Sequence, residues 1–270
     1  MGLTYIYRIP RYLSRKVNEV IRSFLWRHEI TQDIRKNKNE LRALANKHLN
    51  QPCVIIGGGP SINKMNLTEL KDIVTIGCNA FYLKHEEIGF VPTYYTVEDP
   101  LPAEDNKEEI AAIDGTTRII PWDLKSTIQS KKDTIYVNFR RSKVSYRNSK
   151  FPLYSHDFLE ESHWGGTVMY FNIQLAEYLG CNPIYLIGVD LTYNVPDTVV
   201  KNGAVLTSTE NDENHFDPRY FGAGKRWHLP ETERMQKAFE VANAELGKIG
   251  KNLYNSTIGG NLKNIPRKNY

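Results

Sequence analysis

One stretch constrains the fold of this chain more than any other, and it reads Cys53-Val54-Ile55-Ile56-Gly57-Gly58-Gly59-Pro60-Ser61. Its apolar half predicts a buried strand, and the apolar spacing beyond it predicts a helix over residues 61–71. Glycine adopts positive φ and lets the backbone approach a ligand, while Pro60 and Ser61 suit the first turn of a helix. Because unpaired amides at a helix start attract phosphate, the turn is a candidate nucleotide site, with an ordinary tight turn as the alternative.

Strand-like and helix-like stretches alternate along the rest of the chain. Strands are predicted at residues 53–57, 73–78, 93–97, 117–121, 134–138, 184–189 and 252–255, and helices at 61–71, 104–113, 167–179 and 230–248. This alternation predicts an α/β, Rossmann-like fold with a mostly parallel sheet and helices on both faces. Residues 191–229 lack strong periodicity, and so long a loop in a compact domain is usually functional, often as a lid.

The N-terminal segment concentrates positive charge. The six basic residues of positions 1–30 face two acidic ones, an excess equal to the net charge of +4 of the whole chain. The basic residues are Arg8, Arg11, Arg15, Lys16, Arg22 and Arg27, and the acidic ones are Glu19 and Glu29. Apolar residues at helical spacing over 11–30 predict a basic amphipathic helix. Such a helix can lie on an anionic membrane, pack on the body of the domain or pair with a second copy, which would make a homo-oligomer.

Cysteine usage and hydropathy bear on the compartment. Cys53, Cys78 and Cys181 lie far apart without metal-ligand spacing, which predicts buried free thiols in a reducing compartment. No apolar run is long enough to span a bilayer, and the N-terminus has no signal-peptide core. We therefore expect a cytoplasmic protein, peripheral on the inner face of the plasma membrane if the helix binds lipid. The net charge of +4 is too small to indicate a nucleic-acid partner.

Polar residues follow several of the predicted strands, where ligands of doubly wound sheets bind. Asn79 can hydrogen-bond a ribose, base or phosphate, or cap the next turn. Asp190 can orient a ligand hydroxyl, bind a metal or hold loop amides. Glu98 and Asp99 are adjacent, so their side chains should face opposite ways and not form a carboxylate pair.

Two further motifs carry candidate chemistry. Gly165-Gly166-Thr167 precedes a predicted helix and forms a second amide-rich helix start, with close helix packing as the alternative reason for the glycines. His215 and His228 lie in the long loop, and His228 stands directly before the helix predicted from residue 230. A helix N-terminus disfavours the imidazolium and keeps a histidine available as a neutral base, although either histidine can instead be structural.

The order of these motifs resembles the bacterial sialyltransferases of glycosyltransferase family 42. The matching stretches are Gly57-Gly58-Gly59-Pro60-Ser61, Gly77-Cys78-Asn79, Ile184-Tyr185-Leu186-Ile187-Gly188-Val189-Asp190 and the histidine before a helix. The chain is still more similar to the related family of flagellar Maf glycosyltransferases and archaeal 6-hydroxymethylpterin diphosphokinases. Residues 214–221, 226–228 and 254–260 carry that second similarity, and together the two cover residues 52–266.

The resemblance implies a sialyltransferase-like enzyme that moves a nonulosonic acid from a CMP donor to a glycan, surface-polysaccharide or lipid-linked saccharide acceptor. It implies a basic helical segment over residues 1–50 and a Rossmann-like, nucleotide-sugar-binding catalytic domain over 51–270. It makes His228 the general base, followed by His215, and requires neither metal nor other cofactor. The implied nucleotide-binding residues are Gly57, Gly58, Gly59, Pro60, Ser61, Asn79, Gly166, Thr167, Asp190, Thr192 and Tyr193, and the acceptor-binding residues are Glu98, Asp99, His163 and Trp164.

The resemblance also leaves alternatives. The pterin branch implies an ATP- and Mg²⁺-dependent diphosphokinase acting on a 6-hydroxymethylpterin-like substrate, with Asp190, Asp99 and Glu98 as the candidates to hold the metal. A third reading is a non-catalytic nucleotide-binding scaffold in a glycan assembly. The chain departs from family 42 at Gly58, which replaces an asparagine, and at Thr192, which replaces a phosphate-binding tyrosine that the neighbouring Tyr193 can substitute for.

Overall fold

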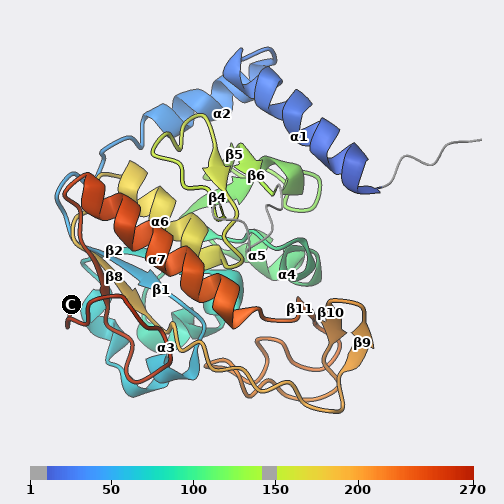
Figure 1. Ribbon diagram of the computed structural model, residues 1–270, viewed down its shortest axis with the longest axis vertical. Coiled ribbons are helices and arrows are strands. Elements are labelled where there is room, and N and C mark those ends of the chain that lie inside the picture. Colours follow the sequence, from blue (N-terminus) through green and yellow to red (C-terminus); the bar gives the residue numbers. More distant parts are fainter. Residues whose placement is uncertain (1–10, 142–150) are drawn as a thin grey trace, which may run out of the picture.

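The structure, a computed structural model, describes the backbone of residues 11–141 and 151–270 and the side chains from residue 16 onward. Its centre is a seven-stranded sheet in the order β12-β8-β1-β2-β3-β4-β5, in which every neighbouring pair is parallel (Figure 1). The strands are β1 (Cys53–Ile56), β2 (Val74–Cys78), β3 (Tyr94–Thr96), β4 (Thr117–Pro121), β5 (Thr134–Val137), β8 (Ile184–Ile187) and β12 (Leu253–Asn255). All seven predicted strands are present, and the predicted α/β, Rossmann-like class is confirmed.

The central strand β1 explains why the sheet is easy to read from the sequence. All four of its side chains are fully buried, and they alternate between the two faces. Ile55 packs into the core beneath α6 (Val168–Tyr178), whereas Ile56 packs into the core on the other face. The chain leaves β1 in one direction through β2 to β5 and returns to its other side with β8. The strand order therefore reverses at β1, and ligands of such sheets bind at this switch point.

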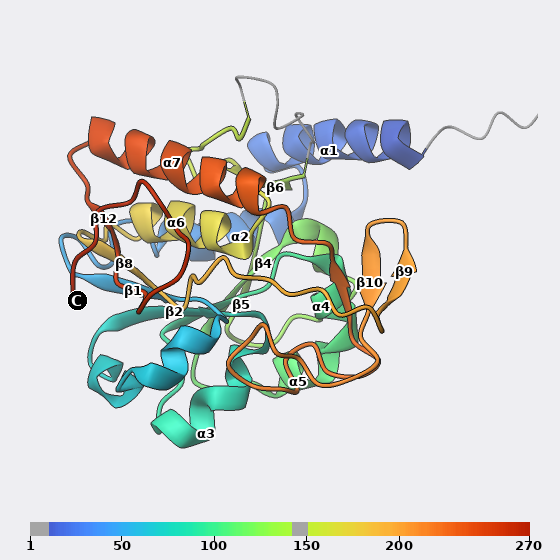
Figure 2. The ribbon, with the colours of Figure 1, turned by 60° about the horizontal axis from the view of Figure 1, so that its bottom comes forward.

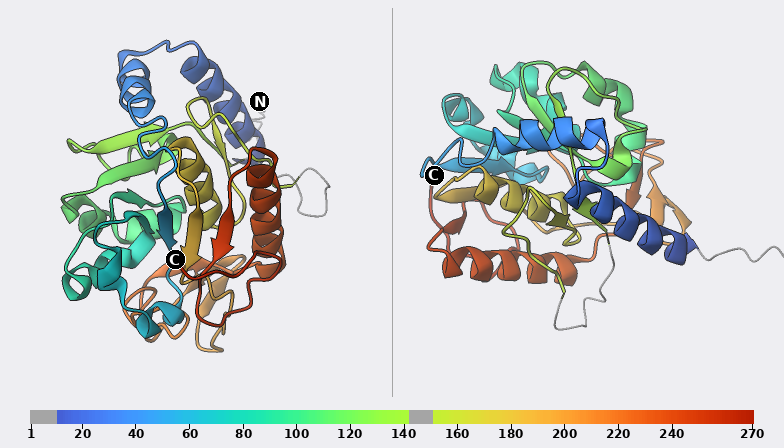
Figure 3. Two further views of the ribbon diagram at one scale, coloured as in Figure 1. Left: turned by 90° about the vertical axis from the view of Figure 1, so that its left-hand side faces the viewer. Right: turned by 90° about the horizontal axis from the view of Figure 1, so that it is seen from above.

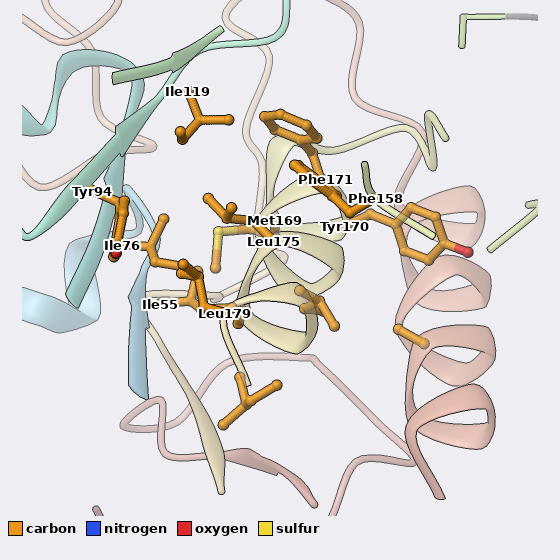
Figure 4. Close-up of a cluster of buried hydrophobic side chains, with 14 of the residues drawn as sticks. Ile55, Ile76, Tyr94, Ile119, Phe158, Met169, Tyr170, Phe171, Leu175 and Leu179 are labelled. Carbon is orange, nitrogen blue, oxygen red and sulfur yellow. The ribbon is translucent and has the colours of Figure 1, made fainter. Parts of the chain in front are cut away.

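Helices cover both faces of the sheet, as predicted. Figure 2 shows α1 (Arg11–Arg27), α2 (Gln32–Arg42), α6 and α7 (Thr232–Lys248) on one face. The other face carries α3 (His85–Ile88), α4 (Pro100–Asp105) and α5 (Lys107–Ala112). The helix α6 lies between the sheet and α7, and its Met169 and Leu175 pack against Ile55 and Ile76 of the sheet (Figure 4). This buried layer fixes the position of the turn that precedes α6.

Two of the predicted helices are wrong. The stretch 61–71 forms two short 3₁₀ helices, η1 (Pro60–Lys64) and η2 (Leu67–Leu70), because its asparagines make competing hydrogen bonds. Asn63 donates to the carbonyl oxygen of Phe216 at 2.8 Å, and Asn66 donates to Glu69 at 2.9 Å. The stretch 104–113 breaks into α4 and α5 at Asn106, whose amide donates to the carbonyl oxygen of Pro102. The predicted helices 167–179 and 230–248 are confirmed as α6 and α7.

The region 191–229 has more regular structure than the sequence indicates. It contains a three-stranded antiparallel sheet of β9 (Val200–Asn202), β10 (Val205–Thr207) and β11 (Arg226–His228), and its hairpin projects beyond α4 (Figures 1 and 2). A small core of Val199, Leu206 and Trp227 holds these strands together. Strands of three residues are too short to show a period, so the expectation of an unstructured loop is wrong here.

The N-terminal segment packs on the body of the protein. Trp26 of α1 and Ile34 and Leu41 of α2 belong to the same buried core as α6. Figure 3 shows α1 at the rim of the helical layer, beside α2. Of the basic residues that the sequence singled out, Arg8 lies outside the described residues, as do the side chains of Arg11 and Arg15.

The remaining elements connect these layers. They are η3 (Asn79–Lys84), η4 (Trp122–Leu124), and the paired short strands β6 (Phe139–Arg140) and β7 (Ser162–His163). In the described part of the chain, no helix combines the length and hydropathy needed to cross a membrane. All three cysteines are buried free thiols, as the sequence predicted.

Candidate active site

Two adjoining cavities open beyond the carboxyl ends of the strands. The larger has a volume of about 280 Å³, and the smaller of about 50 Å³. Of the predicted site residues, the larger cavity is lined by Asn79, Glu98, Asp99, Trp164, Gly166, Thr167, Tyr193, His215 and His228. The smaller is lined by Gly58, Gly59, Thr167, Asp190, Thr192, Tyr193 and His215. Thr167, Tyr193 and His215 belong to both walls, so residues spread over much of the chain meet in one site.

The three glycines after β1 meet different neighbours. A Cβ at Gly57 would lie 2.4 Å from the carbonyl oxygen of Gly188, and one at Gly59 would lie 1.8 Å from Asp190. Gly57 therefore lets the turns after β1 and β8 pack backbone to backbone, and Gly59 leaves room for the carboxylate of Asp190. A Cβ at Gly58 would instead meet the rings of Tyr220 and His215 at 2.8 and 2.9 Å. Packing, the alternative reading of this motif, thus explains Gly57, while Gly58 and Gly59 also line the smaller cavity.

The expected phosphate site at a helix start takes another form. The glycine turn leads into the short 3₁₀ helix η1, so no α-helix dipole stands behind it. Pro60 and Ser61 lie outside both cavity walls, as does Gly57. Ser61 is buried and donates its hydroxyl to Asp190 at 2.7 Å, which fixes the Asp190 carboxylate beside Gly59. Burial raises the pKa of Asp190, and the bond from Ser61 partly offsets that rise.

Asn79 is held in an unfavourable backbone conformation at the cavity wall. Its φ is +50°, a value uncommon for residues other than glycine, and Tyr95 donates to its carbonyl oxygen at 2.5 Å. Its side-chain oxygen Oδ1 is buried and has no hydrogen-bond partner among the described residues. Backbone strain and an unsatisfied acceptor are features of binding sites, so Asn79 can accept a hydrogen bond from a ligand donor.

His228 forms a hydrogen-bonded pair with Asp99. Its Nδ1 lies 2.6 Å from Oδ2 of Asp99, and the other oxygen of Asp99 accepts from the backbone N–H of Leu101 at 2.9 Å. Asp99 therefore caps α4 and orients the histidine with the same carboxylate. The expectation that His228 directly precedes a helix is wrong, because it ends β11 and α7 begins at Thr232. The carboxylate, not a helix dipole, sets the orientation of the imidazole.

His215 forms a second such pair, with Asp212. The distance from Nδ1 to Oδ2 is 2.7 Å, and the imidazole stacks on Tyr220 with ring centroids 4.0 Å apart. Burial alone would raise the pKa of Asp212, but the bonds from His215 and from two backbone amides hold it below its usual range. The Cδ2 edge of the imidazole, away from Asp212, faces Gly58. His215 thus lies beside the glycine turn, while His228 lies in the larger cavity.

A buried charge cluster forms another part of the larger cavity wall. Arg141 donates to Glu98 at 3.0 Å and to Asp123 at 2.5 Å, and both Arg141 and Glu98 are buried. Burial raises the pKa of Glu98 to about 7, and the nearby Asp99 and Asp123 add to the effect while Arg141 opposes it. Glu98 and Asp99 have different hydrogen-bond partners, Arg141 and His228, but both side chains line the larger cavity.

The start of α6 supplies the remaining predicted residues. Gly166 has a φ of +86°, and Thr167 caps the helix by accepting from the amide of Met169 at 3.3 Å. Trp164 lies in the larger cavity, with the guanidinium of Arg234 at 5.1 Å from its ring centroid. His163 does not join them: it lies outside both cavity walls and pairs with Glu161 at 3.3 Å. An indole beside a guanidinium suits a sugar ring that carries a negative group.

Several site residues were missed in the sequence. They are Arg141, Tyr220, Trp227 and Arg234, together with Asp212. Asp212 precedes His215 by three positions and could have been found as a local partner, whereas no sequence signal links Arg141 to Glu98. Within residues 11–141 and 151–270, no group of three or more His, Cys, Asp or Glu side chains converges to hold a metal ion. The three carboxylates considered for Mg²⁺ each bond to a different side chain.

The comparisons with known proteins agree with this architecture. A family model described as 6-hydroxymethylpterin diphosphokinase MptE-like matches residues 28–196, more than half of the chain. The solved structure of a Maf glycosyltransferase from Magnetospirillum magneticum AMB-1 superposes with a TM-score of 0.52 at 19% identity. The match covers 82% of this chain but 34% of that one, so this chain spans about a third of its length. No curated protein matches the chain.

Proposed function

The chain belongs to the MptE-like family, and on that premise we propose that it is a glycosyltransferase that moves a sugar from a nucleotide donor to a saccharide acceptor. The observation that carries the proposal is the pair of adjoining cavities, one at the glycine turn and one containing His228 paired with Asp99. The Maf protein with the same fold is described as a glycosyltransferase, which supports this reading. The resemblance of the motifs to family 42 favours a CMP-linked nonulosonic acid as the donor.

In this proposal His228 is the general base. A carboxylate at Nδ1 favours the tautomer that carries its proton there, so the basic lone pair is at Nε2. Nε2 takes the proton of the acceptor hydroxyl while that oxygen bonds to the anomeric carbon. The bond from the anomeric carbon to the phosphate oxygen breaks in the same step, and the electron pair leaves with the nucleotide. The transfer therefore inverts the anomeric configuration.

The departing phosphate needs stabilisation on the opposite side of the site. We place it in the smaller cavity, whose wall includes the backbone of Gly58 and Gly59. His215 lies beside the glycine turn, held by Asp212, and its ring edge toward Gly58 would contact the departing phosphate. Asn79 would accept a hydrogen bond from the donor through its unsatisfied oxygen. The saccharide acceptor would stack on Trp164 in the larger cavity.

The family description names the competing activity, a 6-hydroxymethylpterin diphosphokinase, for which we expect ATP and Mg²⁺. Phosphoryl-type transfer uses carboxylates that converge on a metal bound to phosphate oxygens. Here Asp190 bonds to Ser61, Asp99 to His228 and Glu98 to Arg141, so each carboxylate already has a different task. The His–Asp pair in an open cavity, by contrast, suits the deprotonation of a sugar hydroxyl. We therefore favour the glycosyltransferase.

A ligand panel separates the two activities. Thermal unfolding would be measured with CMP, CDP, UDP, GDP and ATP, each with and without Mg²⁺, followed by transfer assays with the stabilising donor. The proposal expects the largest stabilisation from CMP without Mg²⁺, and turnover that survives EDTA. Stabilisation by ATP only with Mg²⁺, together with EDTA-sensitive diphosphate transfer to a hydroxymethylpterin, would establish the competing activity. Binding of a nucleotide without any turnover would indicate the scaffold.

A further inference from the structure

The helix α1 contacts the body of the protein through the side that carries Glu19, Arg22 and the buried Trp26. Glu19 is buried and accepts from the backbone N–H of Arg141 at 2.9 Å. Arg22 donates to the carbonyl oxygen of Phe139, and the fully buried Trp26 donates its indole N–H to the carbonyl oxygen of Leu159 at 2.7 Å. These three residues recur at the spacing of one helix face, so one side of α1 is fixed by polar contacts.

The opposite side of α1 is apolar and exposed. Val17, Val20, Ile21 and Phe24 have exposed fractions of 54, 63, 50 and 59%, and their spacing also defines one helix face. We call these four residues the apolar face of α1. Helices on the surface of a globular domain normally turn such a face toward the core. Here the orientation is reversed, and Figure 3 shows α1 at the rim of the molecule.

The charges around the apolar face are basic. Lys16 and Arg27 are exposed on α1, and the ring of His28 lies 4.5 Å from that of Phe24. The two carboxylates of this segment are withdrawn from the surface of the face. Glu19 is buried against the body, and Glu29 pairs with Arg42 and Lys38. The exposed side of α1 therefore combines apolar side chains with positive charge.

We propose that the apolar face of α1 docks on an anionic membrane surface. A helix of this composition inserts its apolar side chains among lipid headgroups while its basic residues meet the negative surface. A second copy of the chain fits less well. Four half-exposed side chains cover only part of the roughly 800 Å² that each partner buries in a stable interface. A second copy would also bring its own Lys16 and Arg27 close to these.

Docking in this way would bring the larger cavity near the membrane. Glu19 holds the backbone of Arg141, and the side chain of Arg141 lines that cavity. The apolar face lies on the other side of the same helix, and an α-helix with side chains is about 10 Å across. The helix α1 and the side chain of Arg141 therefore lie between the docked surface and this part of the cavity wall. A lipid-linked saccharide is the acceptor class that this placement favours, a step that rests on the proposed function, whereas membrane binding does not.

The test uses the full chain and vesicle co-sedimentation. Vesicles of phosphatidylcholine with phosphatidylglycerol in a 7:3 ratio would be compared with vesicles of phosphatidylcholine alone. The variant Val20→Asp/Phe24→Asp should lose at least tenfold in partition to the anionic vesicles, because it puts carboxylates into the apolar face. The control Leu49→Asp changes an apolar residue that is 60% exposed outside α1, and it should bind as the wild type does.

Three further readings complete the test. Raising the salt concentration should weaken wild-type binding, and thermal unfolding of the double variant should match that of the wild type because both positions are exposed. Equal binding by the double variant and the wild type, or no preference for anionic vesicles, would overturn the proposal. So would a dimer, seen by light scattering, that the double variant abolishes while vesicles leave the wild type in solution. Because sedimentation needs no substrate, its outcome is independent of the transfer assays.

Discussion

The two histidine–carboxylate pairs of the site have the same bond and different surroundings. The Nδ1-to-oxygen distance is 2.7 Å in His215–Asp212 and 2.6 Å in His228–Asp99. The exposed fractions of the side chains are 11 and 4% in the first pair, against 48 and 26% in the second. In the first pair the carboxylate also accepts from two backbone amides, and the imidazole is stacked on an aromatic ring. In the second pair the carboxylate accepts from one backbone amide, that of Leu101.

The difference indicates how one motif can serve two tasks. An enclosed pair keeps its geometry, which suits a fixed hydrogen-bonding partner for a phosphate. An accessible pair can exchange a proton with a substrate that enters the cavity. The local sequence around each histidine shows neither property. His215 is enclosed by Tyr220 and Gly58, whereas His228 is oriented by Asp99. Variants of each histidine–carboxylate pair test this comparison.

The largest expected effect is on turnover at the accessible pair. His228→Ala should lower kcat by about 100- to 10,000-fold, because it removes the general base. It should leave the free energy of unfolding nearly unchanged, since the side chain is half exposed. Steady-state kinetics and urea denaturation measure the two quantities. The matched control is His156→Ala, another exposed histidine with carboxylate partners but outside both cavity walls, which should keep wild-type turnover.

Near wild-type turnover of His228→Ala would remove it from the mechanism and make His215 the next base to test. The enclosed pair, and not the accessible one, would then be the candidate for proton transfer.

The enclosed pair should respond in stability. Asp212→Ala should lower the free energy of unfolding by about 2–4 kcal/mol, because it leaves His215 and two buried amides without their acceptor. Asp99→Ala should cost less, about 1 kcal/mol, because its pair is accessible to solvent and the main loss is its cap on α4. Urea denaturation of both variants measures the difference. Equal costs would show that enclosure does not distinguish the two pairs.

A third prediction concerns Glu98, which stands next to the accessible pair. Its pKa is raised to about 7, so between its ordinary value and pH 7 the folded protein holds a proton that the unfolded chain releases. Glu98 should therefore add most to the free energy of unfolding below about pH 4.5. This contribution should fall by up to about 3 kcal/mol as the pH rises through 7.

The variant Glu98→Gln isolates this contribution, since it keeps the shape of the side chain without the ionisation. Urea denaturation between pH 5 and 8 should give a flatter curve for the variant than for the wild type. Parallel curves would mean that Arg141 keeps Glu98 ionised throughout.

The smallest effect is expected at the carboxylate of the accessible pair. Asp99→Asn retains an oxygen that can cap α4 but no longer favours the correct tautomer of His228. We expect kcat to fall by about tenfold, with KM nearly unchanged, because His228 also keeps its backbone place in β11. A change in KM alone would indicate that Asp99 contacts the acceptor instead of positioning the base.

The sequence predicted the sheet well and the short elements poorly. Strands such as β1 and β8 are buried on both faces, so their apolar runs stand out, and a glycine turn marks the end of each. The 3₁₀ helices after Gly59 and the strands near Trp227 are a few residues long, and tertiary hydrogen bonds decide their form. Such hydrogen bonds cannot be inferred from local sequence patterns.

The sequence indicated candidate site residues but not which of them form hydrogen-bonded pairs. Strand ends indicated Asn79 and Asp99, because topology brings such positions to one edge of the sheet, whereas His228 was indicated by the helix expected after it and by the resemblance. Which of them pair could not be read, since Asp99 and His228 lie 129 positions apart. The role of α1 shows the same limit. Its amphipathic pattern was evident, but not which side would face the protein.

Thr167, Tyr193 and His215 belong to the walls of both cavities, and this has a thermodynamic consequence. A ligand that moves or orders a shared wall changes the free energy of binding in the neighbouring cavity. Linkage then requires reciprocity: the factor by which a bound nucleotide alters acceptor affinity must equal the factor by which the acceptor alters nucleotide affinity. If that factor exceeds one, each ligand strengthens the binding of the other, so the two cavities are more often filled together than separate affinities would give.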